Sequence, residues 1–121
     1  MSTKVEKFED LMVWHNAVDL SVEVCNTLKN CKDYSIKDQM VRSSISVPSN
    51  IAEGFERQYN KEFIHFLFIA KGSAGELRTQ LLIAFKLGFL NEVRFNELPD
   101  QNRKVSSQLF NLIKTRKEKF S

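Results

Sequence analysis

Two histidines are the residues of this 121-residue chain best suited to metal binding or acid–base catalysis. Glu62 and His65 form a Glu-x-x-His pair, a spacing that binds di-metal centres in ferritin-like helical bundles. Such a centre needs a second pair, and the other histidine, His15, follows Met12 where a glutamate would be required. We therefore expect no metal, no cofactor and no enzymatic activity. His15 is expected to lie in the apolar seam of its helix with its ring nitrogens hydrogen-bonded.

The two cysteines, Cys25 and Cys31, lie six residues apart and lack a Cys-x-x-Cys spacing. Reduced thiols are the favoured interpretation over a disulfide or a metal site. The first residues, MSTKVEKFED, are polar where a secretory signal would be apolar. The longest apolar run, FIHFLFIA at 63–70, is too short to span a membrane. These features predict a cytoplasmic protein with no membrane partner.

Positive charge is concentrated in the second half of the chain. The formal net charge is +3, but residues 1–60 hold 7 Lys/Arg against 9 Asp/Glu and residues 61–121 hold 11 against 6. The C-terminal stretch KTRKEKFS alone holds four basic residues. Such a distribution is compatible with a nucleic-acid partner, and also with solvated helix ends whose cations complement the macrodipole.

The elements that carry these residues are predicted to be helices, because the chain has only two prolines and four glycines. Apolar spacings of three and four predict helices at about 9–30, 36–57, 61–87 and 98–118. Ser35 and Asn60 are the predicted N-caps of the second and third helices, and Gly88 is the predicted end of the third. Short connections favour one all-α domain over residues 1–121, an up-down-up-down, left-handed four-helix bundle.

The third predicted helix has a second apolar surface besides its core seam. Phe63, Leu67, Ala70, Ala74, Leu77, Leu81 and Ala84 follow an unbroken heptad spacing, which is typical of knobs-into-holes packing. Phe66, Phe68 and Ile69 cannot all point inward with that seam, so we expect them to contact another copy of the chain. Gly72 and Gly75 inside this helix predict close approach of a neighbouring helix.

A polar stripe surrounds the proline of the second predicted helix. Pro48 removes one backbone donor and clashes with the carbonyl four residues earlier, so the helix is expected to bend there, or to restart with Ser46 as a new N-cap. Neighbouring Ser and Asn side chains are expected to satisfy the freed backbone groups. Glu53 and Arg57, four residues apart, predict an ion pair.

The stretch QMVRSSISVPSNIAEGFER, followed by KEFIHFLFIAKGSAGELRTQL, resembles a bacterial family of four-helix bundle proteins, the ribosomal RNA intervening-sequence proteins. It also resembles the accessory variability protein of diversity-generating retroelements. The resemblance covers the chain from FEDLMVWHNAVDL through KLGFL. Two blocks are the most specific for the family. The first contains Ser46, Pro48, Ser49, Asn50, Glu53 and Gly54, and the second contains Gly72, Ser73 and Glu76.

The resemblance implies a noncatalytic homopentamer that binds RNA, DNA or a reverse transcriptase-like protein through a basic surface, with no small-molecule substrate. Val41 and Glu56 stand where the family usually has Arg and Gly, which lowers positive charge near the polar stripe. A purely structural scaffold that binds no nucleic acid is the alternative. The candidate nucleic-acid contacts are Arg42, Arg57, Lys61, Lys71, Arg78, Lys114, Arg116, Lys117 and Lys119.

Overall fold

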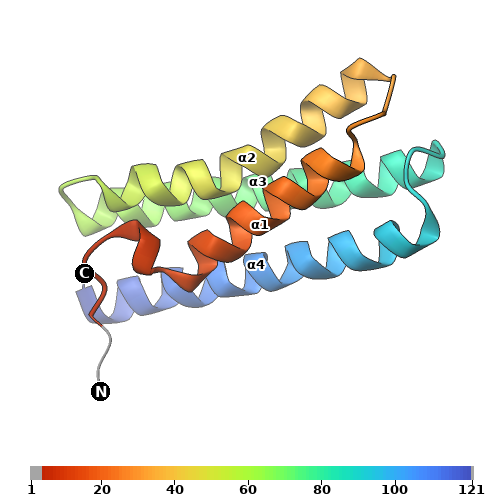
Figure 1. Ribbon diagram of the computed structural model, residues 1–121. Coiled ribbons are helices and arrows are strands. Elements are labelled where there is room, and N and C mark those ends of the chain that lie inside the picture. Colours follow the sequence, from red (N-terminus) through yellow and green to blue (C-terminus); the bar gives the residue numbers. More distant parts are fainter. Residues whose placement is uncertain (1–3, 121) are drawn as a thin grey trace.

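The computed structural model describes residues 4–120, with side chains through residue 119. A short 3₁₀ helix, η1 (Phe8–Asp10), precedes four α-helices: α1 (Met12–Thr27), α2 (Tyr34–Phe55), α3 (Asn60–Lys86) and α4 (Glu92–Phe120). Successive helices run in opposite directions, and the end of α4 lies beside η1 and the α2–α3 connection (Figure 1). Each helix packs against its neighbours in the chain, and α1 packs against α4. The predicted all-α four-helix bundle is confirmed, whereas its left-handed packing stays a prediction.

The heptad seam of α3 forms the centre of the core. All seven of its predicted members are buried. On α1, Ala17, Leu20 and Val24 are fully buried, whereas Val22 is half exposed. His15 is exposed, so its predicted place in the seam is wrong, although its Nε2 donates a hydrogen bond to the carbonyl of Glu9 at 2.6 Å. The buried face of α1 therefore excludes His15 and Val22.

The N-terminal caps of α2 and α3 differ from the predicted residues. Asp33, not Ser35, caps α2 and accepts a hydrogen bond from the Ile36 amide at 3.2 Å. Asn60 is the first residue of α3 rather than its cap, and Tyr59 takes the cap position with no side-chain hydrogen bond. Gly88 is confirmed as the end of α3. Its φ of 84° is left-handed, and the Phe89 amide reaches back to the Ala84 carbonyl at 2.8 Å.

Helix α4 begins at Glu92, six residues before the predicted start. The Asn91 side chain caps it by accepting a hydrogen bond from the Arg94 amide at 2.8 Å. Arg94 then binds the end of α1, with its Nη2 atom 2.7 Å from a Glu23 carboxylate oxygen and 2.6 Å from the Thr27 hydroxyl. Hydrogen bonding to Glu23 raises the pKa of Arg94. This contact with α1 stabilises the first turn of α4. The local sequence, with Pro99 in the stretch NELPD at 96–100, does not predict a helix there.

Helix α2 continues through Pro48 without interruption, so the predicted restart at Ser46 is wrong, and the bend stays a prediction. Proline cannot donate to the carbonyl of Ser44, which lies four residues earlier. The hydroxyl of Ser21 on α1 donates to this carbonyl at 2.6 Å. Ser21 and Ser44 are both buried. A neighbouring helix thus satisfies the carbonyl that we expected residues beside the proline to satisfy.

Close helix approach occurs at Gly54, not at Gly72 or Gly75. A Cβ atom built on Gly54 would lie 2.6 Å from the Cβ of Phe66, whereas one built on Gly72 or Gly75 would meet nothing within 4 Å in the described part of the chain. The prediction for Gly72 and Gly75 is therefore wrong within one subunit. Gly54 instead allows the end of α2 to lie against the first turns of α3.

Candidate nucleic-acid interface

The two motif blocks meet where α2 packs on α3. The hydroxyls of Ser46 and Ser73 are hydrogen-bonded at 2.8 Å. Asn50 donates from its Nδ2 atom to the Ser46 carbonyl at 2.8 Å and is 2.9 Å from the Ser46 hydroxyl. Ser73 is buried, and Ser49 and Glu76 are exposed. Residues 27 positions apart in the sequence therefore form one polar contact that fixes the α2–α3 register.

Arg57 is surrounded by carboxylates. Its guanidinium lies 3.7 Å from Glu53, as the sequence predicts, and 3.8 Å from Glu62 on α3. The same guanidinium covers the Phe66 ring at 4.7 Å from its centroid. Two acidic neighbours offset its charge, so Arg57 is poorly placed to attract phosphate.

Arg116 joins the end of α4 to the start of α3. Its Nε donates to the Asn60 side-chain oxygen at 2.7 Å, and the Asn60 amide donates to the Arg116 carbonyl at 3.1 Å. The guanidinium also lies 5.1 Å from the centroid of Phe63. Burial lowers the pKa of Arg116. These contacts indicate a structural function for Arg116 and explain why Asn60 does not cap its own helix.

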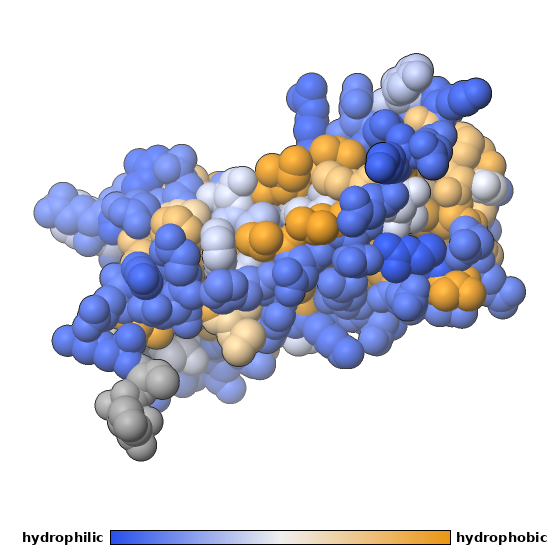
Figure 2. All heavy atoms as spheres, viewed as in Figure 1, coloured by the Kyte–Doolittle hydropathy of each residue, from blue (hydrophilic) through white to orange (hydrophobic). Residues whose placement is uncertain are grey.

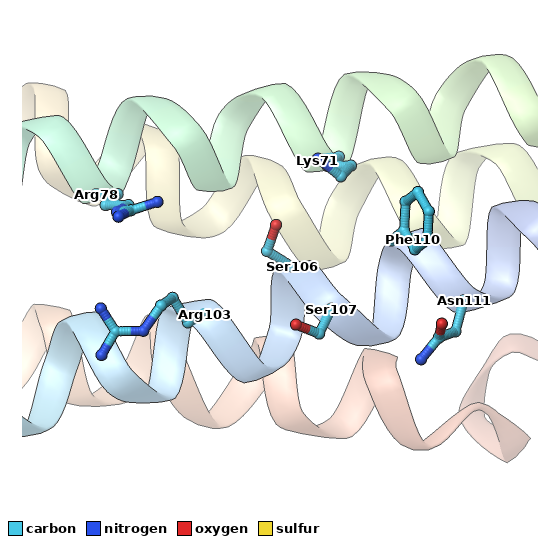
Figure 3. A pocket seen from close by; sticks show the side chains of 7 residues that line it. All are labelled: Lys71, Arg78, Arg103, Ser106, Ser107, Phe110 and Asn111. Atoms are coloured by element: carbon cyan, nitrogen blue, oxygen red, sulfur yellow. The ribbon is translucent and has the colours of Figure 1, made fainter.

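A basic cleft lies between α3 and α4. Lys71 and Arg78 project from α3, and Arg103 on α4 lies opposite Arg78 at one end of the cleft (Figure 3). Phe110 lies further along α4 near Lys71, and this residue is 57% exposed. The space has a volume of about 500 Å³, and no acidic residue is among the seven that line it. Polar groups complete the lining: Ser106, Ser107 and Asn111.

The cleft continues toward the start of α4, where Gly75, Leu82 and Pro99 line its walls together with Arg78 and Arg103. Asp100 lies 3.5 Å from Arg103 and offsets part of its charge.

In the other direction, Arg103, Ser107, Phe110 and Lys114 follow spacings of four, three and four along α4. This periodicity places Lys114 on the same side of the helix as the cleft. At that end, the Lys117 ammonium lies over the Phe68 ring, 5.0 Å from its centroid.

The remaining predicted contacts are spread over the surface. Arg42 is exposed on α2, Lys61 is exposed in the first turn of α3, and Lys119 is exposed near the end of α4. Of the nine predicted cations, the structure brings Lys71 and Arg78 together in the cleft. Arg103 and Phe110 were not predicted, although the regular spacing on α4 was a signal available in the sequence.

Two of the three apolar residues that are predicted to face outward on α3 are exposed. Phe68 is 48% exposed and Ile69 is 38% exposed, whereas Phe66 is half-buried against Gly54 and Arg57. Leu82 and Ile83 extend the exposed apolar surface toward the end of the helix. Apolar groups also reach the surface on the side that α1 covers, where they form a band between hydrophilic margins (Figure 2).

The described residues contain no group of three or more His, Cys, Asp and Glu side chains that could hold a metal ion. Glu62 faces Arg57, and His65 packs edge-on against Phe66 with ring centroids 5.7 Å apart. None of the helices within residues 4–120 has the length and apolar character needed to cross a membrane.

The fold defines the class of the molecule, a small antiparallel four-helix bundle protein. Residues 9–111 match the family model described as 23S rRNA-intervening sequence protein. The chain belongs to this family, which confirms the resemblance of its motifs to the intervening-sequence proteins. No curated protein matches the sequence.

A crystal structure of a protein with unknown function, from the S23 ribosomal protein family of Bacteroides thetaiotaomicron, has the same fold. The two structures superpose with a TM-score of 0.81 at 22% sequence identity, over 86% of this chain and 100% of the other. At this identity the similarity supports the fold alone.

Proposed function

We propose that this protein is a noncatalytic homo-oligomer, with five copies, that binds nucleic acid through the cleft between α3 and α4. The observation that carries the proposal is the convergence of Lys71, Arg78 and Arg103 on one cleft whose lining residues include no acid. Clustered cations attract phosphates and release counterions from nucleic acid, which is the main source of sequence-independent affinity. Family membership supports this function over an unrelated use of the cleft.

Self-association is supported by the apolar residues that α3 leaves exposed, including Phe68, Ile69 and Ile83. Such residues lose contact with water when copies pack together. Five subunits of net charge +3 would carry a total charge of about +15, which strengthens phosphate attraction. Light scattering tests the assembly directly, because five copies of the 14.1 kDa chain have a mass of about 70 kDa.

Fluorescence anisotropy with labelled 20-nucleotide RNA and DNA tests the binding. We expect affinity to fall steeply with added salt, because each neutralised phosphate contributes about 0.7 to 0.9 to the slope of log K against log salt concentration. Replacing Lys71, Arg78 and Arg103 together by glutamine should reduce that slope by about two or more. The matched control replaces Lys4, Lys29 and Lys32, which are exposed outside the cleft and change the net charge equally.

A control triple variant as impaired as the cleft variant would contradict the proposed site. An absence of binding to either nucleic acid at low salt would refute the proposed function. Retention of a reverse transcriptase-like protein by the same surface, without nucleic acid, would instead identify a protein as the partner.

A second candidate is a structural scaffold that binds only its own copies. It is supported by the use of Arg57, Arg116 and the Ser46–Ser73 contact within the subunit. The glutamine triple variant of Lys71, Arg78 and Arg103 discriminates the candidates. A scaffold function predicts unchanged or lost assembly with no nucleic-acid affinity to lose, whereas a binding function predicts intact assembly with reduced affinity.

A further inference from the structure

We propose that the α3–α4 cleft selects single-stranded over double-stranded nucleic acid, because Phe110 stacks on an unpaired base. This inference rests on the proposed function. It adds whether the ligand is single-stranded or double-stranded, and which residue distinguishes the two forms. Its starting observation is an aromatic residue, Phe110, that is 57% exposed within a cleft otherwise lined by basic and neutral polar groups. Figure 3 shows Phe110 and Lys71 on facing helices of this cleft.

The Phe110 ring is free for such a contact. Within residues 4–119, no aromatic ring or cation packs on it. Other rings on these two helices have partners: Phe85 stacks on Phe95 at 4.1 Å, and Phe68 lies beneath the Lys117 ammonium. A basic groove combined with an accessible aromatic face is the arrangement by which proteins bind single strands without sequence preference.

The length of the cleft suits a short run of nucleotides. Arg103 and Lys114 are eleven residues apart on α4, a distance of about 16 Å at 1.5 Å per residue. At about 3.4 Å per stacked nucleotide, this corresponds to about five nucleotides. Phe110 lies between these two cations, so phosphates can be held on either side of the stacked base.

A duplex offers the same phosphates but not the same bases. Its bases are already stacked on one another, so Phe110 reaches one only after that base leaves the helix, which costs free energy. The cations therefore contribute to the affinity for both forms, whereas the ring contributes only to the affinity for a single strand. Ser106, Ser107 and Asn111 supply hydrogen-bonding groups beside the ring, and these can contact sugar or phosphate in either form.

The test compares a labelled 20-nucleotide oligouridylate with a 20-base-pair RNA duplex of mixed sequence at one salt concentration. Phe110→Leu keeps an apolar side chain and removes the π face. We expect it to raise the Kd for oligouridylate about 5- to 150-fold and the Kd for the duplex less than about twofold. Phe110→Trp should preserve the preference, and oligouridylate should quench the fluorescence of the new indole. Tyr34→Leu, a change at another exposed aromatic residue outside the cleft, should alter neither Kd.

Equal effects of Phe110→Leu on both probes, or no effect on either, would overturn the inference while leaving the proposed function intact. Loss of the oligomer in Phe110→Leu without a selective loss of oligouridylate would also overturn it, because the ring would then be a contact between copies. If neither probe binds the unmodified protein, the proposed function itself fails.

Discussion

The Ser21 hydroxyl should stabilise the fold mainly because Pro48 lies on α2. Pro48 has no amide hydrogen to offer the carbonyl of Ser44, and Ser21 supplies the missing donor from α1 at 2.6 Å. The same hydroxyl also lies 3.1 Å from the Ala17 carbonyl in its own helix, which is farther than its distance from the Ser44 carbonyl. Since Ser44 is fully buried, water cannot readily replace the donor. The substitution Ser21→Ala therefore leaves a buried carbonyl without its partner.

A buried acceptor that loses its partner costs about 1–3 kcal/mol. For a chain of 121 residues, with an unfolding entropy of about 2.1 cal/mol/K per residue, each kcal/mol lowers Tm by about 4 °C. Ser21→Ala should accordingly lower Tm by about 4–12 °C. In the Pro48→Ala background the restored amide can donate to Ser44 within the helix. There the same change at Ser21 should cost less than about 0.5 kcal/mol, so the two substitutions should couple by about 0.5–3 kcal/mol.

A double-mutant cycle by urea denaturation at one protomer concentration measures this coupling. Fixing the concentration matters because association of copies contributes to the apparent stability. Ser49→Ala provides a matched control, since Ser49 is exposed and lies next to Pro48; its cost should stay within about 0.5 kcal/mol. An equal cost of Ser21→Ala in both backgrounds would refute the reasoning, because the hydroxyl would then act independently of the proline.

Two further predictions concern α2–α3 packing and the N-terminal turn. Gly54→Ala should destabilise the protein by about 1–3 kcal/mol in urea denaturation, because its Cβ would lie 2.6 Å from Phe66; Gly72→Ala, at an open helical position, should instead stabilise the subunit by up to about 1 kcal/mol. Similar effects of the two changes would contradict the assigned close approach. Hydrogen bonds from the backbone amides of Glu6 and Lys7 lower the pKa of Asp10 below its ordinary value of 3.8. The carboxylate should thus favour the turn above about pH 4 and lose that effect as pH falls through the lowered pKa; an NMR titration giving 3.8 or higher would exclude this.

The heptad pattern of α3 could be predicted from the sequence because burial follows local helical geometry. The start of α4 could not be predicted in this way. Asn91 caps it locally, but the turn that follows is held by Arg94 binding Glu23 and Thr27, which lie about 70 residues earlier in the chain. Similarly, Ser35 is the predicted cap of α2, but Asp33, two residues earlier, has the extended backbone angles of a cap residue and accepts the hydrogen bond. Periodicity is therefore a better guide to which residues are buried than to where the helices begin.

The site was harder to predict because it lies between two helices. Lys71 and Arg78 are seven residues apart on α3, so their shared side was predictable. That Arg103 lies opposite Arg78 depends on the rotation of α4, which is fixed by buried contacts such as the hydrogen bond from Asn102 to the Ala74 carbonyl at 2.8 Å. Counting cations likewise could not separate Arg116, which holds two helix ends together, from residues that face solvent.

The two proposed functions of α3 can operate together because they use different sides of the helix. At 100° per residue, Ile69 and Ile83 lie about 150° around the axis from Lys71 and Arg78. A copy that packs over the isoleucines therefore leaves the cleft open. Phe68 lies between these two sides and already contacts Lys117, so it belongs closer to the cleft than the predicted interface set suggested. Ile69 and Ile83 are the residues whose replacement should separate assembly from nucleic-acid binding.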